Sequence, residues 1–176
     1  MAYFYNFPVI PYDNYGEGNF QLMTNLLRRV GLRTKVSSNK LFFDTYDVKE
    51  GETPESLADK LYGDSELHYI IMMVNDISDR FHQWPKTSSQ FLKYLNDKYT
   101  NPDGVHHYEI TQTSGDTSVK IDIGTDNTNY PSASIVTNRE YEQKTEDESR
   151  KIRLLAPEYV SDFVEEFNSL MGESRI

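Results

Sequence analysis

Residues 46–63, with the sequence YDVKEGETPESLADKLYG, decide the fold of this chain. Apolar and charged residues alternate at the start of this stretch, which predicts a strand over residues 42–49. Gly51 can supply a tight turn, Thr53 can cap a helix, and Pro54 suits the first helical position. The helix should end at Gly63, and its buried face should carry Leu57, Ala58, Leu61 and Tyr62.

The residues after Gly63 predict a second helix that lies in the core. From Ser65, which can act as a cap, to Val74 the chain is apolar on nearly all sides, and the apolar run stops at Asn75 and Asp76. A helix that is apolar all round is normally buried. Trp84 follows in an irregular link, and Thr87 to Gln90 match a capping box that opens a third helix, with Phe91, Leu92 and Leu95 on one face.

The chain changes character over residues 100–136, where small polar residues dominate. Two short alternating segments around Ser114 to Asp116 predict a β-hairpin with a loop after it. A capping box at Thr137 to Glu140 then starts a helix that is charged almost all round. We interpret its carboxylates, residues 140–148, as a solvated helix face. A short strand at 151–155 and an amphipathic helix from Pro157 to Met171 complete the chain.

The N-terminal region combines an aromatic arm with an apolar stripe. Residues 1–16 should be extended, because Pro8 and Pro11 oppose a helix. Residues 19–30 place Leu22, Met23, Leu26, Leu27 and Val30 at helical spacing, which predicts an amphipathic helix. The aromatic side chains of the arm must be buried either on their own domain or on a partner.

Composition and charge limit the function. The chain has 176 residues, no cysteine and a formal net charge of -10. Five basic and two acidic residues give residues 1–40 a charge of +3, so the remainder carries -13. This balance disfavours nucleic acid as a partner, and the sequence contains no apolar run long enough to span a membrane and no signal peptide pattern. A basic, aromatic arm could dock against acidic surfaces of neighbouring proteins.

No residue pattern in the sequence indicates catalysis, a metal or a cofactor. His106 and His107 are adjacent in a predicted strand, so they should point to opposite faces and share no metal. Gly16 and Gly18 lack the third glycine and the preceding strand of a dinucleotide motif. We therefore expect that the chain is not an enzyme.

Residues 46–63 resemble the opening of a LysM module, a strand of the type Y-x-V-x-x-G-D-T followed by a helix of the type L-x-x-I-A-x-x-Y/F-G. The resemblance implies an α+β fold with a LysM-like βααβ core, a long β-hairpin-containing insertion, an N-terminal arm and helix, and a C-terminal amphipathic helix. The closing strand of the core would be Lys151 to Leu155. Glycan-binding LysM modules use the two loops that here comprise Gly51, Glu52, Thr53, Pro54, Asn75 and Asp76.

The wider pattern resembles the small baseplate wedge subunit of T-even-like contractile-tailed bacteriophages. It rests on the run Leu61 to Tyr69, on Asn75 and Asp76, and on the strand Arg150 to Arg153 with the final helix. The resemblance implies a structural protein of the virion tail baseplate, assembled in the host cytoplasm. Its partners would be other baseplate wedge proteins, in multiple copies within a symmetric assembly, and not nucleic acid or a membrane. The alternative is a peptidoglycan-binding module of the LysM type, which we consider the weaker hypothesis.

These patterns divide the chain into four regions: residues 1–40, the arm and helix; 41–76, the first part of the LysM-like core; 77–149, the insertion; and 150–176, the closing strand and last helix. The candidate partner-binding residues are six aromatic residues and two arginines of the first region together with the single tryptophan: Tyr3, Phe4, Tyr5, Phe7, Tyr12, Tyr15, Arg28, Arg29 and Trp84.

Overall fold

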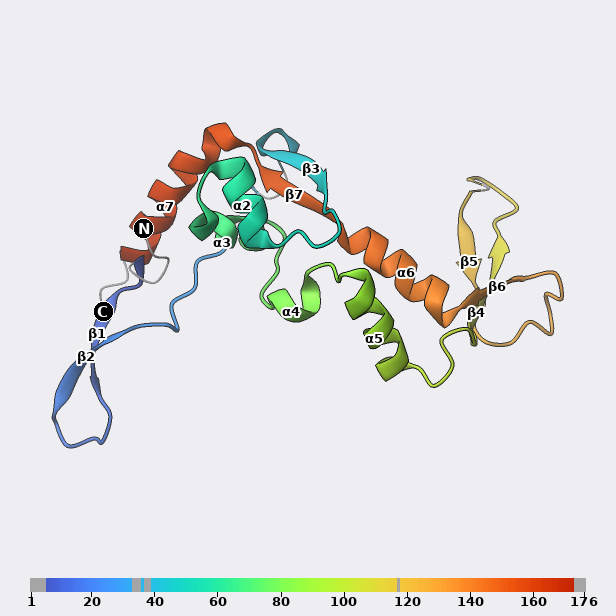
Figure 1. The fold of residues 1–176 in the computed structure, drawn as a ribbon, viewed down its shortest axis with the longest axis horizontal. Helices are drawn as coiled ribbons and strands as arrows, with labels where there is room; N and C mark the ends of the chain where they lie inside the picture. The colour runs from blue at the N-terminus through green and yellow to red at the C-terminus, as the bar shows by residue number, and fades with distance from the viewer. Residues whose placement is uncertain (1–5, 33–35, 37–38, 117, 173–176) are drawn as a thin grey trace. The chain divides into compact units, whose positions relative to one another are not determined.

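The computed structural model describes residues 6–32, 36, 39–116 and 118–172, and it has the expected α+β fold (Figure 1). Its residues form two compact units. The first comprises the chain up to Asp47, then Glu52–Gln83, and the chain from Ile152 onward. The second comprises Val48–Gly51 and Trp84–Lys151. In the described part of the chain no helix is long and apolar enough to cross a membrane.

The first unit is built on a β-α-α-β sequence of elements. Strand β3 (Phe43–Asp47) leads to helix α2 (Pro54–Tyr62), the 3-10 turn η3 (Ser65–Leu67) and helix α3 (His68–Val74), and strand β7 (Lys151–Leu155) pairs with β3. The pairing is antiparallel, because the Ala156 amide bonds to the Phe42 carbonyl and the Val48 amide bonds to the Arg150 carbonyl. Two segments more than 100 residues apart in the chain therefore form one sheet.

The start and end of helix α2 confirm the predicted signals. Thr53 accepts a hydrogen bond from the Ser56 amide, Ser56 accepts one from the Thr53 amide, and Pro54 occupies the first turn. Gly63 ends the helix with a φ of 74°, a left-handed conformation that glycine adopts without steric cost. The capping residue of the next turn is Asp64, one residue before the predicted Ser65.

The core of the first unit lies where α3 meets the last helix. After the 3-10 turn η4 (Pro157–Tyr159), helix α7 (Val160–Gly172) packs Phe167 and Met171 against α3 and β7. The buried cluster consists of Tyr69, Ile70, Val74, Leu155, Phe167 and Met171. The predicted amphipathic C-terminal helix and the apolar core helix are both confirmed. The short elements η2 (Lys40–Phe42) and α4 (Arg80–Gln83) complete the unit.

The prediction of a helix over residues 19–30 is wrong. Strand β2 (Phe20–Thr24) pairs antiparallel with β1 (Val9–Asp13), and the two strands form the N-terminal hairpin, drawn in blue in Figure 1. A single helix of this length needs a core on which to bury its apolar stripe. Leu22 and Leu27 lie exposed in the structure, so no such burial exists, and strand pairing satisfies the backbone instead.

The second unit contains two helices and a three-stranded sheet. Helix α5 (Ser88–Lys98) is followed by strands β4 (Val105–Thr111), β5 (Lys120–Asp122) and β6 (Ser134–Thr137), and then by helix α6 (Asn138–Ser149). Both predicted capping boxes, at Thr87 and at Thr137, are confirmed. The β4–β5 hairpin is also confirmed, but the expected loop after it contains β6, which pairs with the other edge of β4.

Candidate functional site

The N-terminal hairpin carries apolar side chains that its own unit does not cover. Large apolar residues on both strands and just beyond them are between 49% and 90% exposed. A two-stranded hairpin is only marginally stable in water, and contiguous exposed apolar patches are a common feature of interaction sites. The exposed residues are Val9, Tyr12, Tyr15, Phe20, Leu22, Met23, Leu26 and Leu27.

The two edges of the hairpin differ. Pro8 accepts a bond from the Asn25 amide, so the register places Pro11 and Leu22 in a non-hydrogen-bonded pair whose backbone groups point outward. Pro11 has no N–H to offer at that position, and this protects the outer edge of β1 from a further strand. Strand β2 contains neither a proline nor a charged residue, so its outer edge is open to strand addition.

The turn of the hairpin is held by one carboxylate. Asp13 accepts hydrogen bonds from the amides of Tyr15, Gly16, Glu17 and Gly18, at 2.6–3.3 Å. These bonds, of which the bond from Gly18 contributes most, hold the pKa of Asp13 below its usual value. Gly16 and Gly18 have φ values of 71° and 79°, so the Gly-Glu-Gly stretch serves the turn.

The other residues proposed for partner binding have different surroundings. Tyr3, Phe4 and Tyr5 lie outside the described residues. Phe7 is partly buried against the core of the first unit, and Arg28 donates from Nη2 to the Leu170 carbonyl at 3.0 Å. Arg29 is exposed, whereas Trp84 is buried at 6% exposure, so it does not contribute to the surface of the second unit.

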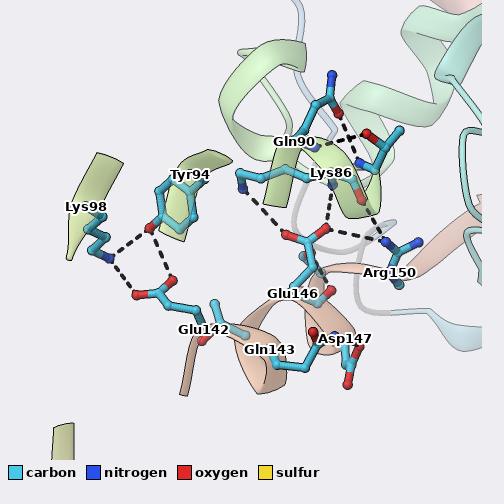
Figure 2. Close-up of polar contacts among 12 residues, drawn as sticks. Lys86, Gln90, Tyr94, Lys98, Glu142, Gln143, Glu146, Asp147 and Arg150 are labelled. Atoms are coloured by element: carbon cyan, nitrogen blue, oxygen red, sulfur yellow. Dashed lines mark hydrogen bonds and ion pairs between the residues drawn. The ribbon is translucent and has the colours of Figure 1, made fainter. Parts of the chain in front are cut away.

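A carboxylate network joins the two helices of the second unit (Figure 2). Glu142 is only 6% exposed, and it accepts hydrogen bonds from Lys98 at 2.7 Å, Tyr99 at 2.7 Å and Tyr94 at 3.1 Å. Lys98 also donates to the Tyr94 hydroxyl at 2.8 Å. Every polar atom of the buried carboxylate therefore has a partner, which is the condition for burying a charge.

One helical turn later, Glu146 makes the second half of the network. It is also 6% exposed and accepts a short bond from the Lys86 amide, while the Lys86 ammonium lies 3.5 Å from its other oxygen. Arg150 donates to the Lys86 and Val48 carbonyls. The interpretation of residues 140–148 as a wholly solvated face is therefore wrong at two positions, spaced i, i+4 on the side of α6 that faces α5.

The electrostatics of the network follow from its geometry. Burial pushes the pKa of Glu142 upward, but the hydrogen bonds from Lys98 and Tyr99 outweigh it, so the pKa lies below the ordinary value of 4.5. Hydrogen bonds to Glu142 and Tyr94 raise the pKa of Lys98. The pair is therefore ionised at neutral pH, and the network acts as a charged tie between α5 and α6.

The histidine pair does not point to opposite faces as predicted. A register irregularity between Val105 and His107 bulges β4, and it brings the two Nδ1 atoms of His106 and His107 to 2.8 Å. A bulge places two consecutive residues opposite one, which changes the alternation of side chains. His106 also stacks on Tyr141 with ring centroids 3.9 Å apart. Among the described residues no group of three or more side chains could hold a metal ion.

The residues that the sequence suggested for a glycan-binding groove mostly serve internal contacts. Glu52 accepts from the Tyr46 hydroxyl and from Lys60, while Thr53 caps α2. Asn75 donates to the Ile71 and Arg153 carbonyls and accepts from the Arg153 amide, all at 2.8 Å. Asn75 therefore ties the end of α3 to the closing strand. The remaining loop residues are Gly51 with a φ of 78°, buried Pro54, and Asp76 with a φ of 55°.

Comparisons with known proteins show which family the chain belongs to. The chain is 24% identical over 145 residues to the baseplate wedge protein gp53 of Enterobacteria phage T4, which covers 74% of each protein. The family described as Base plate wedge protein 53 matches residues 17–170, which include the hairpin strand β2, the β-α-α-β elements and the carboxylate network. The chain therefore belongs to the base plate wedge protein 53 family.

Proposed function

We propose that this chain is a non-enzymatic structural subunit of the phage tail baseplate wedge, which binds neighbouring wedge subunits and helps to join wedges during assembly. It would be assembled in the host cytoplasm and remain in the virion. Membership of the family supports the structural role. The β3–α2–α3–β7 arrangement would be a LysM-like scaffold, and residues 77–149 would be an insertion into it.

The observation that carries this proposal is the exposure of the N-terminal hairpin. Phe20 and Leu22 are 65% and 79% exposed on a strand whose outer edge is free of charge and proline. Burying such residues against a partner removes apolar area from water, which is favourable by roughly 25 cal/mol per Å². An incoming strand would also satisfy the outward backbone groups of β2. Both gains arise only in an assembly.

The test is co-expression of the chain with the other wedge proteins of its source genome, followed by gel filtration and mass spectrometry. We compare the native chain with the double variant Phe20→Ser and Leu22→Ser. These side chains contribute little to their own unit, so the variant should fold. We expect it to lose most of its co-elution with wedge proteins, by roughly tenfold or more.

The matched control is Leu41→Ser together with Phe81→Ser. Both residues are 84% exposed and lie outside the hairpin, so the control removes the same side-chain types from elsewhere in the first unit. Normal co-elution of the control and loss of the hairpin variant would support the proposal. Full incorporation of the hairpin variant would contradict it.

Glycan binding is the weaker alternative. The polar side chains of Thr53 and Asn75, which a LysM-type groove would present, are engaged in capping and in holding β7. Sedimentation of the chain with insoluble peptidoglycan would test the alternative directly, and we expect the chain to remain in the supernatant.

A further inference from the structure

The three-stranded sheet of the second unit has one apolar face and one polar face. The register pairs Ile110 with Ile121 and Tyr108 with Ile135, and the Tyr108 and Ile123 backbones are bonded to each other. Directly paired residues share a face. Together with Val119, whose carbonyl accepts from the Gln112 amide, these residues form what we call the open face: Tyr108, Ile110, Val119, Ile121, Ile123 and Ile135. Gln112 pairs with Val119, so its uncharged side chain lies at the end of the same face.

The opposite, polar face carries the charged side chains of the sheet, together with the paired His107 and Val136. Lys120 donates to the Thr111 hydroxyl at 2.8 Å, and the register places Glu109 on the same side as Asp122 and Ser134. An antiparallel sheet with one apolar face normally packs that face on a core. Here the arrangement is left incomplete, because no residue of the open face is buried and Ile121 and Ile135 are 42% and 55% exposed.

The size and charge of the open face define what can cover it. Three neighbouring strands span about 10 Å between the outer two, which is the length of about two turns of an α-helix that crosses them. The face itself carries no charge, but residues 105–137 contain four acidic residues and one lysine. Asp116 lies in the β4–β5 turn, and Asp126 lies in the connection that leaves β5 at the other end of the sheet.

Both of these aspartates remain ionised. Hydrogen bonds from the Ser118 side chain and amide lower the pKa of Asp116, and those from Thr128 do the same for Asp126. A binding surface with an uncharged centre and negative ends is complementary to an apolar stripe flanked by positive charge. A second copy of this chain fits poorly, because its net charge is -10.

We propose that the open face is a docking site for an amphipathic helix of another protein, with an apolar stripe bordered by lysine or arginine. The helix lies across β5, β4 and β6 and completes a two-layer α/β unit. This site is separate from the hairpin and does not depend on the role proposed for the hairpin.

The test uses the full chain and a defined probe, a synthetic amphipathic helix of about four turns with a leucine stripe and lysine flanks. Titration is followed by backbone NMR. We expect chemical shift changes confined to β4, β5 and β6. The double variant Ile121→Thr and Ile135→Thr keeps β-branched residues in the strands and should weaken binding at least tenfold.

The control variant is Lys120→Gln with Ser134→Thr, which changes the adjacent residue in each strand but on the polar face. It should bind the probe as the native chain does. A peptide of the same composition with scattered leucines should fail to bind. The proposal is overturned if the isoleucine variant binds as well as the native chain, or if the shifts spread over the acidic surface. It is also overturned if the open face mediates self-association in sedimentation equilibrium.

Discussion

The N-terminal hairpin and the α5–α6 helix pair both depart from the usual rule that apolar residues are buried and charged residues are exposed. In the hairpin, Leu22 is 79% exposed, whereas in the helix pair Glu142 is 6% exposed. The hairpin leaves apolar side chains in water, and the helix pair removes carboxylates from it. The two regions belong to different units of the chain.

The difference shows what each region needs in order to be stable. A buried carboxylate is tolerated only when hydrogen bonds and an opposite charge replace water, and Glu142 has three donors. Exposed apolar residues do not prevent the chain from folding, but their contact with water is unfavourable until another surface covers them. The helix pair is therefore complete within its unit, whereas the hairpin leaves apolar side chains that its unit does not cover.

The largest effect should come from breaking the network, with Glu142→Ala. This change leaves Lys98, Tyr94 and Tyr99 without their common acceptor and should lower the free energy of unfolding of the second unit by roughly 2–4 kcal/mol. Trp84 is the only tryptophan and is buried in that unit, so its fluorescence in a urea titration reports the loss. The control is Glu148→Ala, which removes an exposed carboxylate from the same helix. An equal loss of stability in both variants would contradict the stabilising role of the buried Glu142.

Acid should act on the same group with a smaller effect. The pKa of Glu142 is lowered in the folded chain, so its contribution is present above the unfolded value of about 4.5 and is lost as the pH falls through the folded value. In the native chain we expect the urea concentration at the midpoint of unfolding, reported by Trp84 fluorescence, to decrease once the pH is lowered below about 4.5. The fall should be shallower in Glu142→Gln, which cannot ionise. Parallel pH profiles would show that other carboxylates carry the acid sensitivity.

Local signals in the sequence predicted the local structure correctly. Thr53, Thr87 and Thr137 each cap the predicted helix, because a capping box depends only on residues three apart. The errors concern positions where distant segments decide the outcome. Residues 19–24 match a helical stripe, yet their pairing with β1 determines the strand. The burial of Glu142 depends on Lys98 and Tyr94, more than 40 residues away, although the i, i+4 spacings on both helices were a usable signal.

The cap of α6 should contribute less than the network that α6 carries. Thr137 accepts from the Glu140 amide, and Glu140 accepts from the Thr137 amide at 2.8 Å. Thr137→Ala removes the first of these bonds and should cost about 1 kcal/mol. Measured by the same fluorescence titration, a loss as large as that of Glu142→Ala would mean that the cap, and not the buried carboxylate, holds α6 in place. Thr137→Ser should retain the bond and most of the stability.

Substitutions in the hairpin should have the smallest effect on the free energy of unfolding. This expectation distinguishes the hairpin most clearly from the helix pair. Phe20→Thr and Leu22→Thr keep strand-forming residues and remove side chains that are 65% and 79% exposed. Their effect on the free energy of unfolding should stay within about 0.5 kcal/mol, as for other surface substitutions. Thermal unfolding followed by circular dichroism measures it for the whole chain. A large destabilisation would mean that these side chains pack within the isolated chain, and the hairpin would then resemble the helix pair. An unchanged transition, combined with loss of wedge binding, would mean that the apolar surface of the hairpin is maintained for its partner.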